Sequence, residues 1–167
     1  YGNKSGSYRV SSSAIKLTRT MMAALDDMFD AFFAETGSRD YQITQGYRTY
    51  DEQAAIYDDY QEIYGAEQGA LLAARPGYSE HHTGMAIDMN VYTASGVSYS
   101  LATAGAADPI YGWIYENAAK YGLVLRYPDS KTTVTGITNE PWHFRYVGRG
   151  HAAYMAENGL VLEEYLA

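Results

Sequence analysis

A chain of 167 residues is long enough for one compact domain with a buried core and too short for two domains of typical size. Its 20 acidic and 12 basic side chains give a net charge of −8, which argues against a protein that binds nucleic-acid phosphates or an anionic membrane surface. The absence of cysteine excludes a disulfide scaffold, a thiolate zinc site and a cysteine nucleophile.

The first part of the chain predicts a lead-in, a helix and a strand. We expect residues 1–16, which include three consecutive serines, to be a loose lead-in, and residues 17–167 to form a single domain. A helix is predicted over residues 20–36, with Gly37 as its end, and a short strand at Tyr41–Gln45. The helix prediction rests on apolar residues at the spacing of one helix face: Met21, Met22, Leu25, Met28, Phe29, Phe32 and Phe33.

The next stretch predicts a second helix and a second strand. Thr49 and Glu52 fit a capping box, so a helix should begin there and run to the residue before Gly65. After a loop-rich segment, a strand is predicted at Met85–Val91. The turn-rich residues 93–105 indicate a hairpin excursion or an insertion.

The remainder predicts one longer helix, two strands and two short helices. Asp108 and Pro109 are typical of the cap and first turn of a helix, which Gly122 would end. The other predicted elements are strands at Leu123–Tyr127 and Trp142–Val147 and helices at His151–Glu157 and Glu163–Leu166. The crossovers are too few and too uneven for a doubly wound parallel sheet. We therefore predict an α+β fold, a small and mainly antiparallel sheet flanked by helices.

Three of the four histidines lie in polar segments beside carboxylates. If Met85–Val91 is a strand, Asp88 lies on its polar face beside the small Ala86, and Gly84 lets the loop with His81 fold back towards Asp88. An unpaired carboxylate in a half-buried strand is costly, so Asp88 should face a cation or hydrogen-bond donors. In the alternative interpretation, Asp88 caps a turn and the adjacent histidines are exposed.

A second polar segment is Glu140-Pro141-Trp142-His143. Pro141 would fix an extended approach and Trp142 would anchor it by burial, so that Glu140 and His143 point in defined directions. Taken alone, this segment is weak evidence for a site.

Together, the two segments supply His81, Asp88 and His143 as nitrogen and oxygen ligands. Three such ligands with one open position are the arrangement of catalytic zinc sites, and a nearby carboxylate such as Glu140 can take the proton of an activated water. The HExxH helix of the common zinc proteases is absent, so a metal hydrolase here must be built on loops and strands.

The order and spacing of these motifs match a known family. The pattern Ser79-x-His81-x-x-Gly84-x-Ala86-x-Asp88, followed by Glu140-x-Trp142-His143, resembles the zinc D-alanyl-D-alanine carboxypeptidases of the VanY type, and the L,D-carboxypeptidases share it. Residues 46–53, Gly-Tyr-Arg-Thr-Tyr-Asp-Glu-Gln, are similar to the family segment Gly-Tyr-Arg-Ser-Tyr-x-x-Gln. Residues 121–128 and 159–166 are also similar, so the resemblance spans roughly Leu17 to the end.

The resemblance implies a zinc site at the sheet face. His81, Asp88 and His143 would bind Zn²⁺. Glu140 would be the general base that deprotonates the attacking water and then the acid that protonates the leaving amine.

The resemblance also implies three residues that contact substrate. Arg48 would lie over the substrate carbonyl and stabilise the charge that develops on its oxygen. Gln53 and Ser79 would contact the terminal residue of the peptide and its carboxylate.

Four other polar residues are given no catalytic role. His82 neighbours a ligand, but the seven-residue step to the aspartate selects His81, so His82 should have a surface or supporting role. His151 is expected to be structural or exposed. Arg126 and Arg145 are expected to pair with the excess carboxylates.

The leading hypothesis is a zinc carboxypeptidase, in residues 17–167, that removes C-terminal D-Ala from peptidoglycan stem peptides or muramyl peptide precursors. An L,D-carboxypeptidase, an endopeptidase and a non-catalytic cell-wall binding module stay open as alternatives. The presence of both Glu140 and Arg48 argues against the binding module.

Localisation is inferred from the substrate. No apolar run approaches the roughly 20 residues that a membrane-spanning helix needs, and the chain begins at Tyr1, so we expect a signal or anchor to lie outside it. We expect a monomer that acts outside the cytoplasmic membrane, in the bacterial cell envelope.

Overall fold

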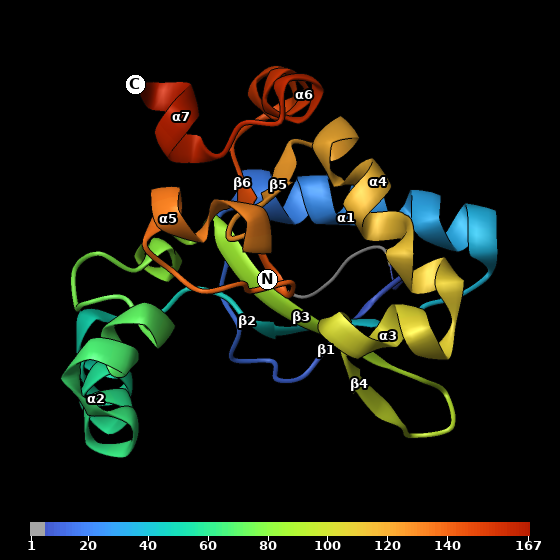
Figure 1. Cartoon of the computed structure of the whole chain (residues 1–167). Helices are drawn as coiled ribbons and strands as arrows, with labels where there is room; N and C mark the ends of the chain where they lie inside the picture. The colour runs from blue at the N-terminus through green and yellow to red at the C-terminus, as the bar shows by residue number, and fades with distance from the viewer. Residues whose placement is uncertain (1–5) are drawn as a thin grey trace.

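The structure is a computed structural model that describes residues 6–167. Within this range, helices surround a sheet of six strands (Figure 1). The strands are β1 (Arg9–Val10), β2 (Tyr41–Gln45), β3 (Ala86–Tyr92), β4 (Ser98–Ser100), β5 (Leu123–Leu125) and β6 (His143–Tyr146). The α-helices are α1 (Arg19–Thr36), α2 (Tyr50–Leu72), α3 (Leu101–Ala107), α4 (Trp113–Asn117), α5 (Thr132–Thr135), α6 (Arg149–Asn158) and α7 (Leu162–Leu166). Short 3₁₀ turns are η1 (Glu80–Thr83), η2 (Pro109–Gly112), η3 (Ala118–Tyr121) and η4 (Asp129–Lys131).

The sheet is open and mostly antiparallel, which confirms the predicted α+β fold. Its strand order is β1-β2-β3-β6-β5, and β4 pairs with the end of β3. All pairings are antiparallel except that of β1 with β2. Strand β3 is therefore central, with β2 along one edge and β6 along the other.

The core lies between α1 and one face of the sheet. The side chain of Thr18 accepts a hydrogen bond from the Met21 amide and caps α1, which ends at Gly37 with a left-handed φ of 73°. Helix α1 buries Met21, Leu25, Met28, Phe29 and Phe32 in one cluster with Tyr41, Ile43, Ile87, Met89, Val91 and Phe144 of the strands. Ile87 and Met89 are thus on the core side of β3, as predicted, and the opposite face is left for polar residues.

The second helix differs from its prediction. Helix α2 starts with the predicted capping box at Thr49, but residues 66–72 return to helical geometry beyond a break at Gly65 (φ 80°, ψ 166°). Gly65 therefore ends the first helical segment, as expected, without ending the element. Figure 1 shows α2 at the lower left, projecting away from α3 and α4.

The region after β3 is a hairpin, followed by helices that were predicted only in part from the sequence. Strand β4 folds back on β3, which confirms the hairpin. Helix α3 was not expected, and the helix predicted from Asp108 is divided into η2, α4 and η3.

The lead-in is more ordered than expected within the described residues. Strand β1 pairs with β2, and Tyr8 is buried against Phe29 with ring centroids 4.7 Å apart. Residues 1–5 of the predicted lead-in lie outside the described residues. In the described part of the chain, no helix is both long and apolar enough to cross a membrane.

Candidate metal centre

The register of β3 and β6 brings two of the predicted ligands together. Asp88 and His143 are directly opposite each other in the antiparallel pair, so their side chains leave the same face of the sheet side by side. His81 comes from η1, which precedes β3, and Gly84 joins the two elements with a left-handed φ of 65°. His81, Asp88 and His143 therefore meet at the sheet face that the core does not use.

A backbone carbonyl fixes the tautomer of His81. Its Nδ1 lies 2.7 Å from the oxygen of Gly46, and because a carbonyl only accepts, Nδ1 carries the proton. The unprotonated Nε2 then faces Asp88, with 3.4 Å between Nε2 and Oδ2. Gly46 is required there because a Cβ atom would come within 2.7 Å of the Lys16 carbonyl oxygen.

His143 has a carboxylate on each side of its ring. Nδ1 lies 3.0 Å from Asp88 Oδ1, and Nε2 lies 3.4 Å from Glu80 Oε2. The ring meets that of His81 edge-on with centroids 4.9 Å apart, and Tyr127 covers it at 5.0 Å. A histidine that donates one ring nitrogen to a carboxylate is oriented to offer the other to a metal ion.

The three residues fit a metal ion. One nitrogen or oxygen atom from each of His81, Asp88 and His143 lies within 4.8 Å of the others, and both histidines are buried. Asp88 Oδ1 is buried and accepts no hydrogen bond from any described residue, so it has a free lone pair inside the cluster. Two neutral imidazoles and a carboxylate with one open position are the donors of a catalytic zinc site.

The charges of the protein groups agree with this arrangement. Burial would raise the pKa of Asp88, but the close contacts with the His143 and His81 imidazoles outweigh burial and hold the pKa well below its usual range. Burial would lower the pKa of His143, but Asp88 and Glu80 outweigh it and raise the pKa to about 9. The cluster is thus built to hold positive charge beside Asp88.

Glu140 lies at the edge of this cluster. Its Oε2 is 3.5 Å from His143 Nδ1, and its amide donates to the Tyr127 carbonyl. Burial and the neighbouring Asp88 charge raise the pKa of Glu140 to about 7, against the opposing effect of His143. A carboxylate with a pKa near neutrality can accept a proton and give it back.

The cluster opens into a cavity of about 590 Å³. Arg48, Gln53 and Ser79 line this cavity together with Glu140 and the three ligand candidates. Arg48 Nη1 donates to Gln53 Oε1 (2.7 Å), and Gln53 Nε2 donates to the Ala74 carbonyl (2.7 Å). Helix α2 and its C-terminal end add an apolar wall, formed by Ile56, Tyr60, Tyr64 and Leu72.

The remaining histidines lie outside the ligand cluster. His82 Nδ1 lies 2.8 Å from the Arg48 carbonyl, and its Nε2 accepts from the Gly77 amide (3.1 Å). His82 thus supports the segment that carries Arg48, in agreement with the supporting role expected for it. His151 is exposed on α6 and contacts Tyr165.

Sequence reasoning assigned no role to Glu80, which the structure places beside the metal centre. Arg126 donates to Glu80 from Nε (2.8 Å), and Arg145 Nη1 lies 3.4 Å from the same oxygen, so both arginines pair with carboxylates as predicted. Burial would raise the pKa of Glu80, but His143 and Arg126 outweigh it and lower the pKa to about 2. The position of Glu80 directly before His81 was the available signal.

Comparisons with known proteins agree with the geometry. The family model of the VanY D-alanyl-D-alanine carboxypeptidases matches residues 14–149. A D-alanyl-D-alanine carboxypeptidase from Enterococcus faecium is 44% identical over 130 residues, which are 78% of this chain and 37% of the relative. The chain spans 37% to 52% of the length of three curated relatives.

Two solved structures are similar over almost the whole chain. The LdcB LD-carboxypeptidase has a TM-score of 0.82 and 34% identity, covering 95% of this chain and 74% of its own. A mutant of the vancomycin resistance D,D-pentapeptidase VanY in complex with Zn(II) has a TM-score of 0.78 and 34% identity, covering 93% and 86%. These matches confirm the resemblance inferred from the motifs, and the chain belongs to the VanY D-alanyl-D-alanine carboxypeptidase family.

Proposed function

We propose that this chain is a zinc-dependent carboxypeptidase that hydrolyses the C-terminal D-Ala from peptidoglycan stem peptides or their precursors. The observation that carries the proposal is the meeting of His81, Asp88 and His143 at a cavity wall beside Glu140. The relatives add support, because one is named a D-alanyl-D-alanine carboxypeptidase and one solved VanY structure contains Zn(II).

His81, Asp88 and His143 would hold the zinc ion. When bound, zinc would polarise the scissile carbonyl and make a water molecule more acidic. Glu140 would accept the proton of the attacking water and pass it to the leaving amine of D-Ala. Its pKa of about 7 supports both steps, because the group is then close to half protonated near neutral pH.

Arg48 and its neighbours would position the peptide. Arg48 lines the cavity beside Glu140, where a fixed positive charge would stabilise the developing oxyanion. Gln53 holds the Arg48 side chain by a hydrogen bond and is buried, and Ser79 is buried on the same wall. We assign Gln53 and Ser79 to the terminal residue of the substrate and its carboxylate.

The net charge of −8 opposes a substrate with a terminal carboxylate. Attraction must therefore be local, from the metal ion and Arg48. We propose that the chain acts as a monomer outside the cytoplasmic membrane and that residues 17–167 are one catalytic domain. Among the described residues, one core cluster that includes Phe29 and Phe144 supports a single domain, and Tyr8 and β1 of the lead-in join the same core and sheet.

An L,D-carboxypeptidase that trims tetrapeptide stems is the second candidate. The observation in its favour is the TM-score of 0.82 with an LD-carboxypeptidase, against 0.78 with the D,D-pentapeptidase at the same 34% identity.

Product analysis by mass spectrometry separates these functions. The purified, zinc-loaded protein is offered a muramyl pentapeptide and a muramyl tetrapeptide side by side. We expect loss of one D-Ala from the pentapeptide. Cleavage of the tetrapeptide alone would assign the L,D activity, and binding of both peptides without cleavage would indicate a binding module.

A further inference from the structure

The last helix is attached to the rest of the molecule by three consecutive polar side chains. Glu163 pairs with Arg126, which follows β5. Glu164 accepts from Lys131 of η4 through both carboxylate oxygens (2.8 Å each), and the Tyr165 hydroxyl contacts His151 of α6 (2.6 Å). Of these three contacts, the one made by Glu163 continues towards the metal centre.

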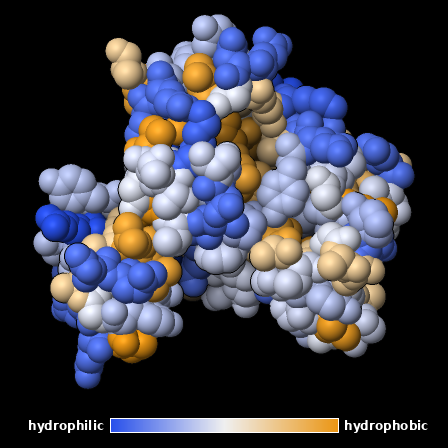
Figure 2. All heavy atoms as spheres, in the orientation of Figure 1, coloured by the Kyte–Doolittle hydropathy of each residue, from blue (hydrophilic) through white to orange (hydrophobic). Residues whose placement is uncertain are grey.

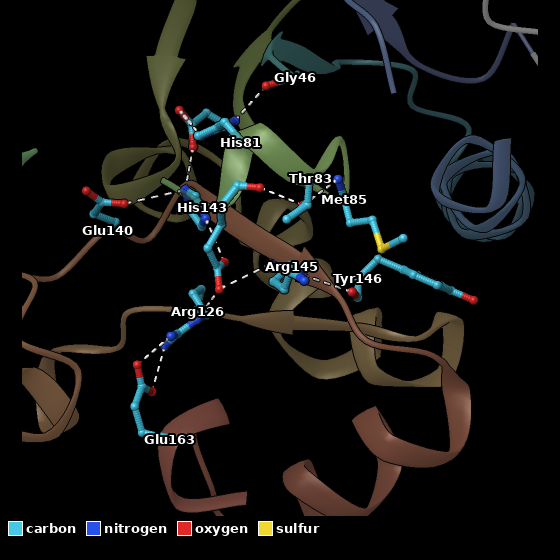
Figure 3. Close-up of polar contacts among 12 residues, drawn as sticks. Gly46, His81, Thr83, Met85, Arg126, Glu140, His143, Arg145, Tyr146 and Glu163 are labelled. Carbon is cyan, nitrogen blue, oxygen red and sulfur yellow. Dashed lines mark hydrogen bonds and ion pairs between the residues drawn. The ribbon is translucent and has the colours of Figure 1, made fainter. Parts of the chain in front are cut away.

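A chain of charged groups joins Glu163 to His143. Both terminal nitrogens of Arg126 donate to the Glu163 carboxylate, with 2.9 Å from Nη1 to Oε2. The Nε of the same guanidinium donates to Glu80 Oε1 (2.8 Å), and the other oxygen of Glu80 faces His143 Nε2 at 3.4 Å. Figure 3 shows Arg126 between Glu163 and His143.

The inner part of this chain of charged groups is buried, and Glu163 at its outer end is 35% exposed. The side chains of Arg126 and Glu80 are 8% and 11% exposed, so solvent screens them little. With Arg145, the group contains two guanidinium ions and two carboxylates, so its charges balance only when Glu163 is counted. Arg126 also stacks on Tyr127 at 4.6 Å, the ring that covers His143.

Loss of the Glu163 charge would act on Glu80. The planar fork of arginine prefers a carboxylate that accepts from two of its nitrogens at once. Without its partner on α7, Arg126 would draw Glu80 into such a pair. The Glu80 oxygen that orients His143 would then turn away from Nε2.

We propose that Glu163 is a positioning residue of the metal centre, which sets the orientation of His143 through Arg126 and Glu80. Helix α7 is then required for the geometry of the metal site, because it carries the carboxylate that holds Arg126. This inference rests on the proposed use of His143 as a metal ligand.

The test compares Glu163→Gln with Glu164→Gln. Both variants keep the length of the side chain, and both remove one charge from a paired carboxylate of α7. In Glu163→Gln an amide NH₂ would face a donor nitrogen of Arg126. Among the described residues, Glu164 forms no hydrogen bond or ion pair with Glu80, Arg126 or His143, so its variant reports only on the capping and docking of α7.

The readouts are zinc affinity, by competition with a chromogenic chelator, and the visible absorption of the Co²⁺-substituted protein. Loss of an outer partner of a metal-binding histidine weakens metal affinity by about 10- to 100-fold. We expect a loss of this size and a changed Co²⁺ spectrum in Glu163→Gln, and wild-type values in Glu164→Gln.

Wild-type zinc affinity and an unchanged Co²⁺ spectrum in folded Glu163→Gln would overturn the proposal, as would equal losses in the two variants. If Glu163→Gln does not fold, Glu163→Asp, which keeps the charge but shortens its reach, is compared with Glu164→Asp by the same readouts. A wild-type protein that binds zinc but cleaves no peptide would refute the proposed function and leave this test intact.

Discussion

The metal centre and the wall that α2 adds to the cavity are built in different ways. The candidate ligands come from the central pair of strands and from η1, and His81 and His143 are only 3% and 4% exposed. In α2, the buried residues are Gln53 and Gly69, and the helix is broken at Gly65. Figure 2 shows apolar side chains among polar ones on the lobe at the lower left, where Figure 1 places α2.

In the proposed enzyme, this difference would assign chemistry and substrate selection to separate parts of the fold. Strand register, core packing and the contacts of Glu80 fix the metal centre, so small changes in the wall should leave it intact. The wall depends on a few local contacts, such as those of Gly69 with Tyr60 and of Thr138 with the Leu71 carbonyl. Changes in the metal centre should therefore affect zinc binding or kcat, and changes in the wall should affect KM.

The largest effect is expected for His143→Ala. Removal of one of three ligand candidates should abolish stoichiometric zinc binding and activity together, which metal analysis after dialysis and the pentapeptide assay would measure. His151→Ala is the control, because His151 is exposed on α6 and should keep both properties. Stoichiometric zinc in folded His143→Ala would contradict the ligand role.

Glu140→Gln should separate metal binding from catalysis. The amide keeps the shape of Glu140 but cannot accept the proton of water, so we expect kcat to fall by about 10²- to 10⁴-fold with zinc retained. Single-turnover kinetics on the zinc-loaded variant would measure this, with Glu157→Gln on the surface of α6 as the control. Turnover within a few-fold of wild type would exclude Glu140 as the base.

The two regions also differ in how well the sequence predicted them. The spacing from His81 to Asp88 and the alternation of β3 were local signals, and the structure brings these residues together with His143. The partners of Glu80 could not be predicted in this way. Arg126 is 46 residues away along the chain, and Glu163 lies a further 37 residues on, so the grouping depends on tertiary packing.

The wall was predicted incompletely for a different reason. Gly65 is a correct local stop signal, but residues 66–72 form a second helical segment that packs back on Tyr60. The close approach at Gly69 is a tertiary contact, and periodicity within one helix does not report it.

Gly69→Ala tests the wall without touching the metal centre. An added Cβ would come within 2.8 Å of the Tyr60 carbonyl oxygen, a backbone atom that moves only if the two helical segments separate. This strain opposes the gain of about 1 kcal/mol in helix propensity that alanine offers over glycine. We expect KM for the pentapeptide to rise several-fold, with kcat and zinc affinity near wild type.

Gly105→Ala is the matched control for this variant. Gly105 lies in α3, where an added Cβ meets no atom within 4 Å, so only the gain in helix propensity remains. Unchanged KM in Gly69→Ala would show that substrate binding does not depend on how closely the two segments of α2 pack.

Thr138→Val should have the smallest effect, and it tests how much one hydrogen bond contributes to the wall. The Thr138 hydroxyl donates to the Leu71 carbonyl at 3.2 Å, but the Thr138 amide donates to the same oxygen at the same distance. Removal of one of two bonds to an exposed acceptor should cost at most about 1 kcal/mol, and the remaining bond keeps the loop on α2. We expect a change of about twofold or less in KM, measured beside Gly69→Ala. Thr138 also lines the cavity, so a tenfold rise in KM would mean that its hydroxyl binds the peptide directly. The selectivity of the wall would then depend on polar contacts as well as on the placement of α2.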